Sequence, residues 1–362
     1  MEKTARKPRN PRIEVLRLVA IMAIAVFHTF QSWFAAAADP TSELAAVFPW
    51  LGKPLGVAAL GCINLLGAYG NHVFYLISGY FLLPAGIQGR PLRLGRKTMT
   101  ILASATFYAV LALLLSCVVP MESVSLHQTG WLLDGLEFIW VYLALILMTP
   151  VMALVAKRLP HWREAVVVLA VLVFGLNAYV AFFSPGEADR GLLEWRKLLS
   201  AASYLVAYLT GGALSGQATT SVKAKTPLVT VIVACLAVEG TLAFMGRADL
   251  AATTSFKSTS LLSYLLAVAS LFLASASSSG EKPVPSWVMA AASSILGVYI
   301  AQSMTSDLWR PAFEDLSAKA AAAGALPALL LCGTVLSLAL VTMCIVFDQL
   351  TRATLLKLLR QS

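Results

Sequence analysis

The chain has 362 residues, of which 59% are hydrophobic and only 12% are charged. Soluble domains carry roughly 25% charged residues, so this composition excludes a soluble protein of one or two domains. The net charge is +9. Because no basic soluble domain accompanies that charge, we expect it to reflect membrane topology and anionic lipid, with no nucleic-acid partner.

The apolar residues fall into blocks long enough to cross a membrane. A hydrocarbon core of about 30 Å requires roughly 20 apolar residues per helix. The blocks predict an all-α, polytopic membrane helix bundle of about ten transmembrane helices. In chain order, the expected spans lie near residues 15–36, 60–83, 98–119, 135–156, 164–183, 198–215, 227–246, 259–275, 287–306 and 325–347. The second is the least regular, because Gly61, Gly67 and Gly70 could break it into a shallow entry piece and a crossing helix.

The distribution of charge between the spans indicates the orientation. Of the 27 lysines and arginines, 19 fall on the side that holds both ends of the chain, and most acidic residues fall on the other. Cytoplasmic segments carry the excess of Lys and Arg, so both termini are predicted to be cytoplasmic. The expected organisation is a basic tail (1–14), one transmembrane domain (15–347) and a C-terminal tail (348–362). The five cysteines lie in apolar segments without metal-ligand spacing, so no metal site is expected.

Few ionisable residues lie inside the predicted spans, and each is a candidate for function. They are Arg17, His28, His72 and Glu239. At about 1.5 Å per residue, His28, His72 and Glu239 lie roughly 16–18 Å from the cytoplasmic face on three different helices. We therefore predict that these three side chains face one polar pocket near the midplane. For His72, a structural hydrogen bond to a neighbouring helix explains the residue equally well.

Several short segments together resemble the bacterial membrane acyltransferase-3 family. The first span carries an Arg and a His eleven residues apart, Arg17 and His28, after Arg12-Ile13-Glu14-Val15-Leu16. The second ends in Phe74-Tyr75-Leu76-Ile77-Ser78-Gly79-Tyr80, and an R-x-x-R pattern follows in Arg90, Arg93 and Arg96. Trp140, Tyr142 and Thr149-Pro150 resemble the fourth helix of the family, and Ser294 to Tyr299 resembles a late helix.

The resemblance implies an O-acyltransferase, and acetyl transfer is the usual chemistry of the family. The donor would be a cytoplasmic acyl-CoA and the acceptor a hydroxyl of a cell-surface glycan or its lipid-linked precursor, with no bound cofactor. Arg17, Arg90, Arg93 and Arg96 would bind the CoA phosphates. His28 would act as the general base or as a transiently acylated relay, with Glu239 and His72 as further catalytic candidates. Ser78, Tyr80, Trp140, Tyr142 and Gln302 would bind substrate. The protein would reside in the bacterial plasma membrane, in contact with lipid.

The chain departs from the family pattern at two positions. Phe138 and Gln302 stand where the family often has histidines, and these changes bear on the acceptor. The alternative function is a proton-coupled transporter with a buried His/Glu relay, although no internal repeat supports it. A sensor or scaffold without catalysis explains the buried ionisable residues least well.

Overall fold

The computed structural model describes residues 10–127, 130–183, 190–217, 221–256, 259–276 and 285–355. Within these ranges the chain is helical and contains no strand. The helices are α1 (Pro11–Ala38), α2 (Glu43–Val47), α3 (Pro54–Ile87), α4 (Leu94–Ser116), α5 (Gly130–Leu133), α6 (Glu137–Arg158), α7 (Trp162–Phe182), α8 (Arg190–Leu214), α9 (Ser221–Phe244), α10 (Ala248–Thr254), α11 (Leu261–Ser275), α12 (Ser286–Met304) and α13 (Ser306–Leu350).

Eight helices in the described residues are long and apolar enough to cross a membrane, so the predicted all-α membrane bundle is confirmed. They are α1, α3, α4, α6, α7, α9, α12 and α13. The remaining two expected spans correspond to α8 and to α11, which has 15 residues. A helix of that length covers about 22 Å, less than the hydrocarbon core. The predicted number of ten is therefore not confirmed.

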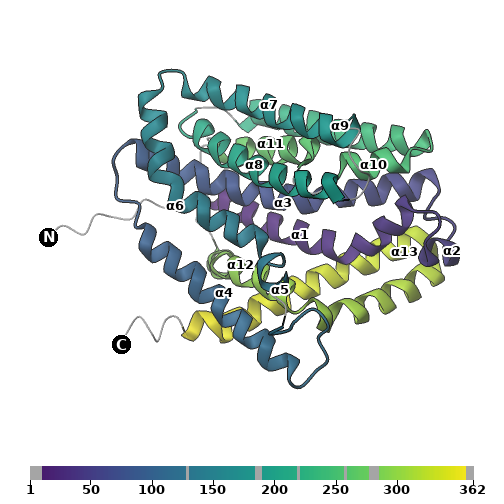
Figure 1. Cartoon of the computed structure of the whole chain (residues 1–362). Coiled ribbons are helices and arrows are strands. Elements are labelled where there is room, and N and C mark those ends of the chain that lie inside the picture. The colour runs from purple at the N-terminus through teal and green to yellow at the C-terminus, as the bar shows by residue number, and fades with distance from the viewer. Residues whose placement is uncertain are drawn as a thin grey trace.

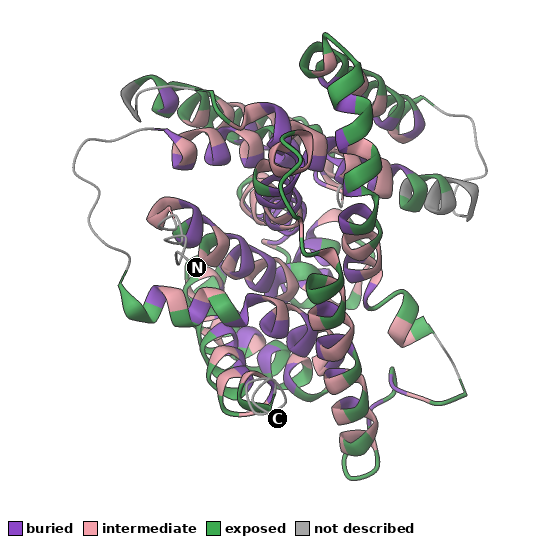
Figure 2. Ribbon diagram, turned by 90° about the vertical axis from the view of Figure 1, so that its left-hand side faces the viewer, coloured by how far each residue is buried: buried purple, intermediate pink, exposed green. Residues whose placement is uncertain are grey.

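The outer surface of the bundle is apolar, as expected for contact with lipid. Val168 and Leu172 of α7 and Val233 and Leu236 of α9 are exposed. Figure 2 shows this pattern, with buried residues along the central helices and exposed residues on the peripheral ones. A soluble protein would not present such large apolar faces to solvent.

Helices α1 and α3 run side by side through the centre of the molecule (Figure 1). On one side they contact α8, α9 and α11, and on the other α12 and α13. The suggested break in the second span is absent, because α3 is one continuous helix. Its glycines allow close packing instead: a Cβ on Gly67 would overlap the Phe27 ring, and one on Gly70 would approach Ala20 O to 2.5 Å.

Helix α13 differs most from the prediction. The segment between the expected spans 287–306 and 325–347 was not predicted to be part of a membrane helix, yet it is helical from Ser306 and continues α12 after Thr305. Its buried residues Trp309, Phe313, Ser317 and Ala321 recur every four positions, so one face packs on the bundle. The chain then kinks at Gly324–Ala325 and crosses back.

The first turn of α1 and the last turns of α13 lie at the same end of the bundle (Figure 1). The basic segment before α4 lies at this end as well, since Arg17, Arg93 and Arg96 line one cavity. That this end faces the cytoplasm stays a prediction from charge. Of the proposed tails (1–14 and 348–362), residues 11–14 belong to α1 and residues 348–350 to α13. Residues 1–9 and 356–362 lie outside the described residues.

Candidate active site

His28 lines a cavity of about 320 Å³ between α1, α3, α6, α8, α12 and α13. We call it the His28 cavity. Its rim includes Asp134, whose side chain is 73% exposed and which pairs with Lys197 at 3.7 Å. Deeper polar groups come from Asn71, Tyr204 and Gln302. The predicted site residues His28 and Gln302 therefore share one cavity.

The His28 imidazole is held by its own helix and keeps one nitrogen free of protein partners. Its ring lies 5.0 Å from that of Phe27 and interacts with the Gln31 side chain one turn away. Among the described residues, nothing hydrogen-bonds to its buried Nδ1. Both amide atoms of Gln302 and the Asn71 side-chain oxygen are likewise buried without a partner. Buried polar atoms normally find partners, so these groups are available to a bound polar molecule.

Arg310 is a member of this cavity that the sequence analysis missed. Its Nε is buried without a hydrogen-bond partner among the described residues, and its guanidinium lies over the Trp309 ring at 5.9 Å. The Trp309 indole donates to Gln302 O at 3.1 Å, which ties the start of α13 to α12. The signal in the sequence was the recurrence of aromatic or small residues every four positions, at Trp309, Phe313, Ser317 and Ala321.

A second cavity, of about 580 Å³, opens at the end of the bundle where α1 begins. We call it the cationic cavity, because four basic side chains line it: Arg17, Arg93, Arg96 and Lys97. Ser78 and Tyr142 also line it, with their hydroxyls 2.8 Å apart. Five of the predicted donor-binding or substrate-binding residues are thus brought together here: Arg17, Arg93, Arg96, Ser78 and Tyr142.

The four basic residues differ in how far they are already neutralised. Arg17 donates to both carboxylate oxygens of Glu14 at 3.1 Å and lies 6.0 Å from the Phe81 ring. Within the described part of the chain, no ion pair involves Arg93, Arg96 or Lys97. The cavity therefore carries excess positive charge that an anion could neutralise.

Three other predicted residues lie away from both cavities, as far as the described lining residues show. Arg90 is exposed before α4. Tyr80 packs against Phe81, with ring centroids 5.2 Å apart. The Trp140 indole donates to Leu132 O at 3.0 Å and faces a third, apolar cavity. Their expected contacts with substrate are not supported by their positions.

His72 and Glu239 are not among the described residues that line the His28 cavity, so the cavity does not support the predicted pocket shared with His28. His72 is fully buried, with the rings of Phe174, Tyr204 and Tyr264 within 6.3 Å. Glu239 is fully buried against Gly61 of α3. Helical rise gives the depth of a residue, but it does not give the direction in which the side chain points.

Comparison with known proteins identifies the family. The sequence profile of the acyltransferase-3 family, described as an acyltransferase domain, matches residues 10–346. The chain belongs to this acyltransferase family. No curated protein and no solved structure matches the chain. The acyltransferase resemblance of the sequence is thereby confirmed, and the match covers both cavities.

In this acyltransferase two aromatic side chains, Phe138 and Tyr299, line both the His28 cavity and the cationic cavity. Their ring centroids are 4.6 Å apart. The two cavities are therefore back to back, and these rings form part of the wall between them.

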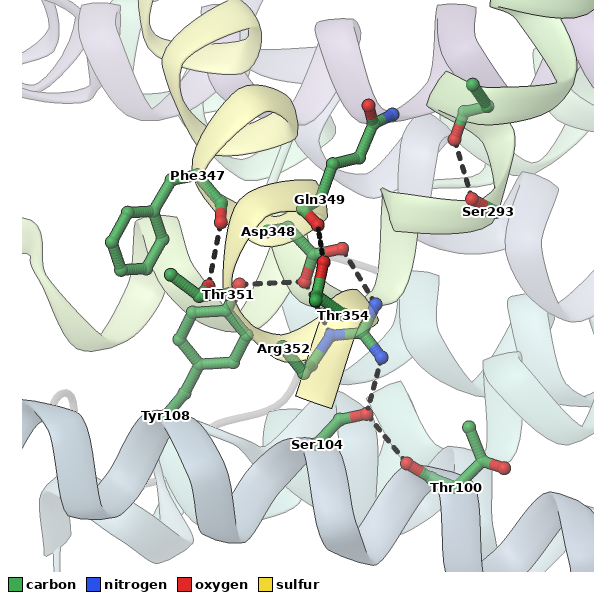
Figure 3. A network of polar contacts seen from close by, with 11 residues as sticks. Thr100, Ser104, Tyr108, Ser293, Phe347, Asp348, Gln349, Thr351, Arg352 and Thr354 are labelled. Atoms are coloured by element: carbon green, nitrogen blue, oxygen red, sulfur yellow. Dashed lines mark hydrogen bonds and ion pairs between the residues drawn. The ribbon is translucent and has the colours of Figure 1, made fainter. Parts of the chain in front are cut away.

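A buried ionic network joins the helices at the cationic end of the acyltransferase (Figure 3). Arg352 donates to both carboxylate oxygens of Asp348 and, at 3.1 Å, to Ser104 of α4. The Tyr108 hydroxyl donates to Asp348 at 2.8 Å. Asp348 lies directly against Gly297 of α12, where a Cβ would overlap it. The network fixes α4 and α12, which both line the cationic cavity.

Proposed function

We propose that this membrane acyltransferase transfers an acyl group from a cytoplasmic acyl-CoA to a hydroxyl of a cell-surface glycan or its lipid-linked precursor. The observation that carries the proposal is the pair of adjoining cavities, one with excess positive charge and one with a histidine. The chain would act in the bacterial plasma membrane.

The cationic cavity suits the donor. CoA is rich in phosphate, and Arg guanidinium groups bind phosphate through paired, charge-assisted hydrogen bonds. Arg93 and Arg96 are exposed at the mouth and Ser78 lies deeper, among apolar residues. A donor with its phosphates at the mouth would extend its thioester inward, toward the wall shared with the His28 cavity.

The His28 cavity suits a polar, uncharged acceptor such as a sugar. It offers hydrogen-bonding atoms without protein partners on Asn71, Gln302 and Arg310, and an aromatic face on Trp309. A few convergent polar groups in a partly aromatic cavity are typical of small-molecule sites. Asp134 and Glu137 add further hydrogen-bond acceptors near the rim.

The reaction follows from the chemistry of imidazole. His28 would accept the proton of the acceptor hydroxyl while the hydroxyl oxygen attacks the thioester carbonyl. The carbon–sulfur bond then breaks, and the departing CoA thiolate takes up the proton from His28. The second route forms an acyl-imidazole on His28, which the acceptor hydroxyl then cleaves. Both routes yield one O-acyl ester and free CoA.

The positions of the ionisable side chains do not favour the transporter alternative. It required His28, His72 and Glu239 to form one relay, and the last two lie outside the His28 cavity as described. The family is one of acyltransferases.

The test is thioester cleavage by membranes that contain the protein, with acyl-CoA supplied at the cationic side and glycan acceptors at the other. Release of CoA should depend on the acceptor. His28→Ala should lower it about 10²-fold or more. The control is His161→Ala, because the side chain of His161 is 84% exposed in the loop before α7. Equal loss in both variants, or transfer above about a tenth of the parent rate in His28→Ala, would refute the role of His28.

Donor binding has its own matched pair of variants. Arg96→Ala should raise the apparent KM for acyl-CoA, whereas Arg90→Ala should leave it near the parent value, because Arg90 lies outside the cavity. Arg96→Lys should restore binding only in part, since Lys keeps the charge but loses the planar fork. A KM that rises equally for Arg90→Ala would assign the effect to general surface charge.

A further inference from the structure

The wall between the two cavities consists of side chains that other residues hold in place. Phe138 is 7% exposed. The Tyr75 hydroxyl donates to the backbone carbonyl of Phe138 at 2.8 Å, and the Tyr75 ring meets the Phe138 ring edge-on with centroids 4.9 Å apart. Tyr142 stacks nearly parallel to the Phe138 ring, at 6.0 Å and an angle of 6°. Such an aromatic cluster leaves the Phe138 ring little freedom to rotate.

Tyr299 supplies the other side of the wall. It comes from α12, and its ring is tilted by 36° against that of Phe138. The two side chains belong to different helices, α6 and α12. A passage between the cavities would therefore run between these helices and be blocked by the two rings.

This arrangement has a chemical consequence. A thioester in the cationic cavity reacts with whatever hydroxyl His28 activates, and water is the most abundant hydroxyl in a cavity with an exposed rim. Attack of water on the thioester carbonyl would give a free carboxylic acid and CoA, which wastes the donor. Apolar rings between the thioester and the His28 cavity would exclude that water.

Resting on the proposed function, we infer that the Phe138–Tyr299 ring pair is a barrier that separates the donor thioester from the water of the His28 cavity and limits loss of the acyl group to hydrolysis. Phe138 suits this barrier because its side chain can neither donate a hydrogen bond nor carry a proton. Passage of the acyl group requires the two rings to separate.

The first test measures access directly and does not need acyl transfer. The five natural cysteines are replaced, Ser78→Cys is introduced in the cationic cavity, and a membrane-impermeant thiol reagent is applied from the side of the His28 cavity. With both rings present, labelling from that side should be negligible, while reagent from the cationic side should react. Adding Phe138→Ala should raise labelling from the His28 side several-fold.

A second opening variant and a matched control guard against general loosening of the fold. Tyr299→Ala should open the same passage from α12. Phe74 also lines the cationic cavity, 6.1 Å from the Phe138 ring, but is not among the described lining residues of the His28 cavity. Phe74→Ala should therefore leave labelling from the His28 side unchanged. Equal labelling of the parent from both sides, or no increase in either opening variant, would overturn the barrier.

The second test measures the ratio of acceptor-independent to acceptor-dependent CoA release. Phe138→Ala should raise this ratio several-fold, and Phe138→Leu, which keeps an apolar side chain in place, should raise it less. An unchanged ratio together with increased labelling would overturn the role in hydrolysis. If labelling behaves as expected but no form of the protein releases CoA, the proposed function fails while the physical barrier stands.

Discussion

Breaking the buried ion pair between Asp348 and Arg352 should destabilise the bundle strongly. The two side chains are 0% and 5% exposed, so neither has water to solvate its charge once the partner is removed. Among the described residues, Arg352→Met leaves the Asp348 carboxylate with one side-chain donor, the Tyr108 hydroxyl. Removal of one member of a buried pair costs about 3–5 kcal/mol.

Replacing both members should recover most of that loss. Apolar substitutions of a whole buried ion pair are often neutral, because the cost of desolvating two charges disappears together with their attraction. We expect Asp348→Leu combined with Arg352→Met to lie well above either single variant. The remaining deficit comes from the Tyr108 hydroxyl, whose loss of an acceptor costs about 1–3 kcal/mol.

An exposed ion pair earlier on α13 provides a control with the same spacing. Asp315 and Lys319 also lie four residues apart on α13, at 2.6 Å, but their side chains are 59% and 71% exposed. Breaking that pair should change the free energy of unfolding by about 0.3–0.5 kcal/mol. The measurement is equilibrium unfolding of the purified protein in mixed micelles. Single variants of the buried pair that cost no more than the exposed pair would refute the reasoning.

Three further predictions concern packing, backbone strain and the acceptor. Gly79→Ala should lower thermal stability, because its Cβ would overlap a carbonyl of α8, whereas Gly240→Ala should be neutral or stabilising, since a Cβ there meets nothing within 4 Å. Ala325→Gly should raise the free energy of unfolding by about 1 kcal/mol, because φ is 51° at this residue; no gain on denaturation would contradict the strain. Arg310→Ala should raise the KM for the acceptor but not for acyl-CoA, and exposed Arg247→Ala should alter neither in steady-state kinetics.

The sequence predicted helix positions well because membrane spans are governed by length and apolarity. It also placed Arg17 with the basic segment before α4, since both belong to the same charged end. It did not predict the neighbour of Glu239 on α9, whose carboxylate packs against Gly61 of α3. The direction in which a side chain points depends on which helices become neighbours, and hydropathy carries no information about that arrangement.

The first half of α13 was missed for a different reason. Charged residues and Pro311 interrupt its apolar pattern, so it was expected to be a segment outside the membrane. The structure makes it a helix with one buried face, which brings Arg310 to the His28 cavity. An amphipathic helix is recognised by its four-residue periodicity, whereas a search for long apolar blocks passes over it.

The length of α3 has a consequence for how the protein responds to its lipid. With 34 residues, α3 extends about 51 Å, well beyond a hydrocarbon core of about 30 Å. Hydrophobic mismatch of this size would normally force tilting or local thickening of the bilayer. Here, however, α3 is largely enclosed by its neighbours, and lipid meets α7 and α9, which have 21 and 24 residues. Differences in bilayer thickness therefore act on the peripheral helices, while the helix pair that carries His28 and Ser78 is shielded from them.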